Sequence, residues 1–167
     1  MSIAEAIQSQ PPNERPVMPA QGLVDAYRLT DFVVQKTDDP IVLQVDHPVR
    51  KLKHWLEAQK SASAVVISAW NPFSMSLSME ENTRRNQELG RAIEIAGLRS
   101  VSASGCARSG NWEPEASFCV FDVPLTLVNE WMQRFEQYAV VRADKNGTCR
   151  LLWHPAIRTA MSARETP

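Results

Sequence analysis

The sequence predicts a single α+β domain, in which a mixed or mainly antiparallel sheet carries about three helices on one face in the order ββαβαββαββ. Its 167 residues suit one hydrophobic core and leave no room for a second domain. Hydrophobic residues make up 44% of the chain and charged residues 22%, which are ordinary values for a folded globular protein. Hairpin signals stand at both ends with helical segments between them, and this argues against a doubly wound nucleotide-binding fold.

The first half of the chain begins with a predicted hairpin, followed by a helix. Segments Arg28 to Gln35 and Pro40 to Val45 are rich in β-branched residues and flank a turn-forming cluster of Thr, Asp and Pro. A helix is expected from Asp46 to Lys60, because apolar residues such as Leu52 and Trp55 recur there at helical spacing.

The middle of the chain predicts a central strand and a long helix. Ala64 to Ala69 is a short continuous apolar run, as expected of a strand that is covered on both faces. Ser78 and Glu81 have the spacing of a capping box, so a helix should begin near Met79. It should end at Gly97, since glycine adopts the left-handed conformation that terminates helices.

The second half predicts two strands, a helix and a closing hairpin. Strands are expected over Arg99 to Ser104 and Ser117 to Val123, on either side of a polar loop from Gly105 to Ser117. Pro124 to Glu136 carries an apolar stripe at helical spacing. The last hairpin should comprise Tyr138 to Arg142 and Thr148 to Trp153, joined by a turn with an Asn-Gly pair.

Both ends of the chain are polar. We expect a disordered leader over residues 1–21, a folded domain over 22–155 and a flexible tail over 156–167. The leader lacks the continuous apolar core of a secretory signal, and no run approaches membrane-spanning length. The sequence therefore predicts a cytoplasmic protein with no membrane partner.

Charge and cysteine spacing narrow the range of partners. Eighteen basic and nineteen acidic residues give a net charge of -1, which makes a nucleic-acid partner unlikely. The three cysteines have no zinc-binding spacing, and His47 and His54 stand seven residues apart without an evident third ligand. We therefore expect no metal and no cofactor.

One face of the predicted long helix changes from apolar to polar, and this is the first candidate site. Asn82, Arg85 and Asn86 occupy the angular positions that are apolar in the later turns. Asn71 and Ser74 lie in the preceding loop, Trp70 to Ser78. With the amides of the helix start they could form a cradle for a carboxylate or phosphate. The alternative is a turn organised by Asn71, with Trp70 on the core and the helix residues in solvent.

The second candidate is the acidic tract before the strand that begins at Ser117. Glu115 could act as a general base if a neighbouring aromatic ring raised its pKa. We favour the alternative of a loop anion or a structural partner for Arg85. Ser117 could be a nucleophile only beside a base, and no histidine stands near it in a pattern that suggests a triad.

These residues resemble an uncharacterised bacterial family, domain-of-unknown-function family 3293, over about Tyr27 to Trp153. The resemblance is carried by Ser68 to Ser74, Asn82, Leu89, Gly97, Trp112, Glu115, Ser117 and Phe135 to Ala139. It implies a shared fold and pocket but no reaction. It further implies one spatial cluster, comprising Asn71, Asn82, Glu115, Ser117 and Gln137.

Three functions remain open at this point. The leading hypothesis is a domain that binds a polar or anionic small molecule between the Trp70 to Ser78 loop, the helix start and the Gly105 to Ser117 loop. The second is a protein-protein interaction or adaptor module, in which the polar groups form an internal network and exposed tryptophans such as Trp131 or Trp153 contact the partner. The third is an enzyme with Glu115 as general base.

Overall fold

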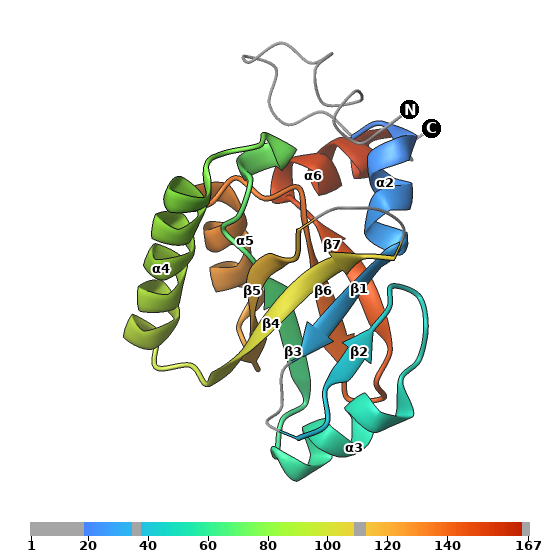
Figure 1. Cartoon of the computed structure of the whole chain (residues 1–167). Helices are drawn as coiled ribbons and strands as arrows, with labels where there is room; N and C mark the ends of the chain where they lie inside the picture. The colour runs from blue at the N-terminus through green and yellow to red at the C-terminus, as the bar shows by residue number, and fades with distance from the viewer. Residues whose placement is uncertain (1–18, 35–37, 109–112, 165–167) are drawn as a thin grey trace.

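Seven strands form one sheet in which every neighbouring pair runs antiparallel, in the order β2-β1-β4-β5-β3-β6-β7 (Figure 1). This computed structural model of the chain describes residues 19–34, 38–108 and 113–164. The strands are β1 (Thr30–Val34), β2 (Ile41–Leu43), β3 (Ser63–Ile67), β4 (Ser100–Ala107), β5 (Glu115–Phe121), β6 (Ala139–Asp144) and β7 (Cys149–Trp153).

Five α-helices and one 3-10 turn connect and flank these strands within the described residues. They are α2 (Gln21–Arg28), α3 (Arg50–Ala58), η1 (Pro72–Ser74), α4 (Met79–Ile95), α5 (Leu125–Arg134) and α6 (Pro155–Arg164). Helices α4 and α5 lie along one side of the sheet, α3 lies at one end of the molecule, and α2 and α6 lie at the other (Figure 1).

The sheet is curled, and the two faces of β3 belong to two separate cores. Ala64 and Val66 pack in a cluster with the inward residues of β1, β2 and β6 and with Trp55 of α3. Residues from both halves of the sheet can share that cluster only on a concave face. Val65 and Ile67 point the other way, toward α4 and α5. Side chains of β3 thus point alternately into the two cores, which explains why the strand is a continuous apolar run.

The curl brings the segment after β2 against the edge strand β7. The backbone N–H of Asp46 donates to the carbonyl oxygen of Cys149 at 2.8 Å, and that of Val49 to Gly147 at 2.9 Å. Gly147 has φ +78°, and a Cβ there would lie 2.5 Å from the Val49 carbonyl oxygen. Only glycine fits this close approach, so the Asn-Gly turn also fixes how the sheet edges meet.

The inner elements confirm the predicted order and the antiparallel sheet, and the predicted helix boundaries of α4 are also confirmed. The Ser78 hydroxyl oxygen accepts a hydrogen bond from the Glu81 N–H at 3.1 Å, and Gly97 after the helix has φ +69°. The placement of all helices on one face is wrong, because Leu52 of α3 packs in the concave core and Leu89 of α4 in the opposite one.

The predicted number of about three helices is also wrong, since α2 and α6 extend the fold at both ends. The tail expected to be flexible forms α6, in which Ile157 is fully buried. The His154 ring caps this helix, because its Nδ1 accepts from the Ala156 N–H at 3.2 Å. A single buried residue leaves no apolar stripe to detect in the sequence. Most of the predicted leader (residues 1–18) and Trp112 lie outside the described residues.

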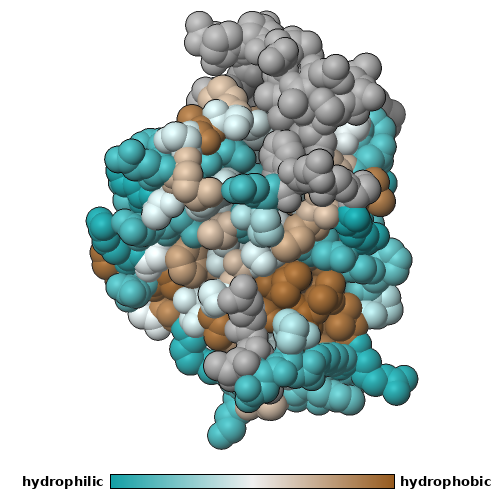
Figure 2. All heavy atoms as spheres, in the orientation of Figure 1, coloured by the Kyte–Doolittle hydropathy of each residue, from teal (hydrophilic) through white to brown (hydrophobic). Residues whose placement is uncertain are grey.

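The surface differs between the two regions visible in Figure 2. The area over α4 is mainly hydrophilic, whereas the area over β1 and β2 is apolar, and Val42 of β2 is 40% exposed. In the described segments, no helix combines the length and the apolar character needed to cross a membrane.

Candidate functional site

The loop that follows β3 has a strained backbone. Asn71, Phe73 and Ser74 have φ values of 45°, 43° and 60°, in the left-handed region that non-glycine residues rarely adopt. Such conformations cost about 1 to 3 kcal/mol each and persist where neighbouring groups hold them in place. The 3-10 turn η1 lies within this loop. The structure therefore has to supply the bonds that hold it.

Asn82 of α4 supplies three of these bonds. The Asn71 N–H donates to Asn82 Oδ1 at 2.8 Å, and Asn82 Nδ2 donates back to Asn71 Oδ1 at 2.8 Å. Asn82 Nδ2 also donates to the Leu77 carbonyl at 3.3 Å, while the Leu77 N–H donates to Asn71 Oδ1 at 3.1 Å. Asn82 is 2% exposed. Its amide is thus buried and engaged within the protein.

Arg85 and Asn86 continue this support along the same helix face. Arg85 Nε donates to the Ala69 carbonyl at 3.0 Å and one Nη donates to the Phe135 carbonyl at 2.7 Å. Asn86 Oδ1 accepts from the Ala69 N–H at 3.2 Å. The polar stripe predicted from the sequence therefore ties α4 to the end of β3 and to the end of α5. These three residues are buried or half-buried, and none of them lines the cavity described below.

A cavity of about 120 Å³ opens on the concave face beside this loop. Its wall comes from α2, β1, β4, β5, the end of β3 and the start of β6, together with the strained loop. Six of the eight predicted binding residues line it, namely Trp70, Asn71, Ser74, Glu115, Ser117 and Gln137. The other two, Asn82 and Arg85, lie behind the loop and hold it.

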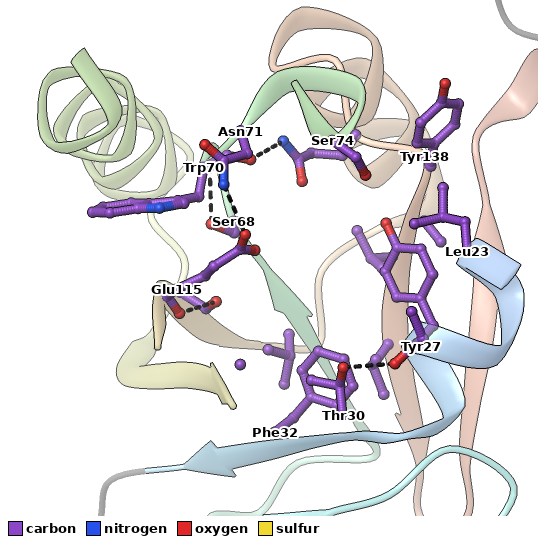
Figure 3. A pocket seen from close by; sticks show the side chains of 18 of the residues that line it. Leu23, Tyr27, Thr30, Phe32, Ser68, Trp70, Asn71, Ser74, Glu115 and Tyr138 are labelled. Atoms are coloured by element: carbon purple, nitrogen blue, oxygen red, sulfur yellow. Dashed lines mark hydrogen bonds between the residues drawn. The ribbon is translucent and has the colours of Figure 1, made fainter. Parts of the chain in front are cut away.

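Glu115 joins the two candidate segments. Asn71 Nδ2 donates to Glu115 Oε1 at 3.0 Å, on one side of the cavity (Figure 3). The expectation of a loop anion or a partner for Arg85 is wrong: Glu115 is the first residue of β5 and stands in register with Gly105 of β4. Strands β4 and β5 both extend into the region predicted as a loop, because residues near the end of β4 pair with residues at the start of β5.

Gln137 fixes the loop against the segment before β6, whereas Ser117 bonds within β5. Gln137 Nε2 donates to the Trp70 carbonyl and to the Phe135 carbonyl, both at 3.0 Å. The Ser117 hydroxyl donates to the Glu115 carbonyl at 3.2 Å, so its hydrogen bond goes to the backbone and not to a base. The Trp70 ring points away from the cavity centre in Figure 3.

Helix α2 provides a wall that the sequence analysis missed. Leu23 and Tyr27 lie on the opposite side of the cavity from Glu115, with Phe32 of β1 below them (Figure 3). Burial and the Glu115 carboxylate raise the pKa of the Tyr27 hydroxyl well above its ordinary value. Leu23 and Tyr27 stand at i and i+4, and this helical spacing was the available signal.

Many donors of the predicted anion cradle are engaged within the protein. Seven backbone N–H groups of the loop already donate within the protein, those of Ala69, Trp70, Asn71, Phe73, Ser74, Met75 and Leu77. At the helix start, the N–H groups of Glu81 and Asn82 are bound by Ser78. Among the described lining residues, the only ionisable carboxylate is Glu115, and no Lys, Arg or His is present.

Fold and site together define a small α+β domain that carries a cavity on the concave face of a curled antiparallel sheet. Residues 67–140 match the family described as "Protein of unknown function (DUF3293)", which confirms the predicted resemblance for this segment. No curated protein and no solved structure matches the chain. The matching segment contains Asn71, Asn82 and Glu115, whereas Tyr27 of α2 lies outside it.

Proposed function

We propose that this domain binds a small polar molecule in the cavity on the concave face. The observation that carries the proposal is the 3.0 Å hydrogen bond from Asn71 to Glu115, which joins the strained loop and β5 at the wall of the cavity. Loops that follow buried strands are frequent places for binding residues. Here α4 and Gln137 hold such a loop in one conformation, so its side chains are arranged before any ligand arrives.

The size of the cavity supports the same proposal. A space of about 10 to 15 Å³ on this measure holds one water molecule. The 120 Å³ beside Glu115 therefore suffices for several water molecules or for a small organic molecule. Its lining combines hydroxyl and carboxylate groups with apolar side chains, the combination found in small-molecule sites.

A steric block tests the proposal. A Cβ on Gly105 would lie 3.6 Å from Thr30 and 3.7 Å from Phe32, which are ordinary contacts, so Gly105→Val should fold while its methyl groups fill part of the cavity. Ser104→Val, on the opposite face of β4, is the matched control. In a thermal-shift screen of metabolites, a ligand at one hundred times its Kd adds about 2.7 kcal/mol of stability. We expect such shifts in the wild type and the control but not in Gly105→Val. Equal shifts in all three proteins, or none in any, would contradict the proposal.

A second candidate is an enzyme that uses Glu115 as general base. The position of Glu115 beside Asn71 in a concave site favours it, because that is the geometry the reaction would need. Glu115→Gln should then abolish turnover of a bound compound while binding persists. The adaptor alternative loses one of its named contact residues, since Trp131 is 2% exposed, whereas Trp153 is half-buried and packs edge-on against Tyr27.

A further inference from the structure

We propose that the ligand of this cavity is a small uncharged cyclic amide, a ring in which an N–H group and a carbonyl group are neighbours, as in a pyrimidine base. The inference rests on the proposed binding function and adds the chemical class of the ligand. Two carboxamide side chains of fixed orientation, the apolar part of the lining and the size of the cavity support it.

Gln137 offers an acceptor to the cavity. Its Nε2 donates to the Trp70 and Phe135 carbonyl oxygens, both at 3.0 Å, so both amide hydrogens are used and the orientation of the amide is fixed. Gln137 Oε1 accepts no hydrogen bond from the described residues. It is also accessible, because Arg158 Nε is the only fully buried side-chain N or O atom without a partner in the described part of the chain. Since Gln137 lines the cavity, its oxygen can accept from an N–H group that enters.

Asn71 offers a donor on the strained loop, to which Gln137 is bonded. Asn71 Oδ1 accepts from the Leu77 N–H and from Asn82 Nδ2, so the orientation of this amide is fixed as well. One hydrogen of Asn71 Nδ2 is donated to Glu115, and the second has no acceptor among the residues that the structure describes. A ligand carbonyl can accept it. An acceptor and a donor on the same wall complement the N–H and C=O of an amide.

The charges of the lining favour an uncharged ligand. No Lys, Arg or His is found among the described residues that line the cavity, so an anionic ligand would have no counter-charge there. The raised pKa of the Tyr27 hydroxyl keeps it protonated at neutral pH. The carboxylate of Glu115 already serves the protein, since it holds the Asn71 amide. A cyclic amide needs no counter-charge and matches this wall.

Rings and apolar side chains form another part of the wall. Figure 3 shows Tyr27 and Phe32 on the far side of the cavity from Asn71. Val66 and Val141 line the cavity too. Flat rings pack favourably against aromatic side chains. The body of a cyclic amide would therefore contact these residues while its N–H and C=O meet the two carboxamides.

The lining hydroxyls and the size of the cavity argue against sugars and nucleotides. The hydroxyls of Thr30, Ser68 and Ser117 each donate to a main-chain carbonyl, so they offer no donor to a ligand. A sugar would leave several of its hydroxyl groups without partners. At about 10 to 15 Å³ for each water, 120 Å³ corresponds to about eight to twelve water molecules. One ring or a fused pair of rings fits this space, whereas a nucleotide does not.

Four probes separate these classes: uracil, 1,3-dimethyluracil, orotate and ribose. Dimethyluracil keeps the ring and both carbonyls but has no N–H, orotate adds a carboxylate, and ribose is an uncharged polyol of similar size. In NMR titrations of the full chain, uracil should bind at least about fivefold more tightly than each of the other three. If uracil does not bind, or if any of the others comes within fivefold of it, the cyclic-amide inference is wrong.

The variant Gln137→Met separates recognition of the ligand from support of the loop. Loss of Nε2 loosens the loop and weakens uracil and dimethyluracil alike, whereas loss of Oε1 affects only the compound that has an N–H. The ratio of the two affinities should therefore fall below about twofold. A ratio that stays at twofold or more would show that Gln137 only supports the loop, and would overturn the inference.

Gln133→Met, at an exposed position of α5, is the matched control and should keep the wild-type ratio. Urea denaturation shows whether Gln137→Met folds, and if it does not, the wild-type comparison of the four probes decides. Failure of the inference is distinguishable from failure of the proposed function. That function survives if any other compound gives a thermal shift that Gly105→Val removes, and it falls if none does.

Discussion

The strongest test of the site architecture is the substitution Asn82→Ala. Three hydrogen bonds link the Asn82 amide to the loop: one from the Asn71 N–H, one to Asn71 Oδ1 and one to the Leu77 carbonyl. Asn71 Oδ1 would keep the Leu77 N–H as a donor, so its loss is partial. The Asn71 N–H and the Leu77 carbonyl would lose their Asn82 partner in a part-buried place.

The magnitude follows from these groups. Each buried polar group left without a partner costs about 1 to 3 kcal/mol. We therefore expect Asn82→Ala to lower the free energy of unfolding by about 2 to 4 kcal/mol, that is, two such groups with some relaxation of the loop. For a domain of this size, each kcal/mol lowers Tm by about 2 to 4 °C.

Urea denaturation measures this loss, and neighbouring positions provide the controls. Thr83→Ala, at an exposed position on the same helix, should change stability by less than about 0.5 kcal/mol. Asn86→Ala removes one bond, to the Ala69 N–H, and should fall between the two. The reasoning is refuted if Asn82→Ala unfolds at the same urea concentration as Thr83→Ala, because the loop would then not depend on this amide.

Three further outcomes are expected. Burial and the nearby Arg158 lower the pKa of His154 in the folded state, so the folded protein binds fewer protons than the unfolded chain and its stability should decline as pH falls below about 6.5. The variant His154→Asn can still cap α6, and urea titrations of it should show a flatter decline. An unchanged pH profile in this variant would exclude His154 as the cause. Gly147→Ala should lower Tm clearly, because its Cβ would lie 2.5 Å from a carbonyl oxygen, whereas alanine at the open position Gly22 should have little effect. Burial raises the pKa of Cys119 and of Cys149 to about 12, so both thiols should resist a thiol reagent at pH 8 until the chain unfolds; rapid labelling of either in the native protein would contradict this.

Signals confined to a few neighbouring residues predicted most of the inner fold. The Ser78 cap, the glycine at 97 and the Asn-Gly turn each specify local backbone geometry: Ser78 accepts from the Glu81 N–H, and Gly97 and Gly147 have positive φ, whereas Asn146 does not. Helices α2 and α6 depend instead on contacts that form only in the folded chain. Val24 and Ile157 are the buried residues of these two helices, and one buried side chain makes no periodic pattern.

The candidate site was predicted in composition but not in layout. The resemblance to the family implied that Asn71, Asn82 and Glu115 form one cluster, and such polar residues need either a ligand or hydrogen-bond partners within the protein. Sequence alone could not separate residues that line a cavity from residues that hold its wall, because both are polar and both are buried. The curl of the sheet decides this, since it brings α2 across from Glu115. It depends on contacts between the segment after β2 and the β6–β7 hairpin that no local pattern encodes.

Some residues line the cavity and others hold its wall, and this separation explains how a strained loop can serve a binding site. Left-handed φ values at Asn71, Phe73 and Ser74 cost an estimated 1 to 3 kcal/mol each. The bonds from α4 and Gln137 oppose that cost in the absence of any ligand. A ligand then does not have to order the loop, and the entropy of ordering does not reduce its affinity. Loosening the loop through Asn82 should therefore weaken binding even though Asn82 lies outside the cavity.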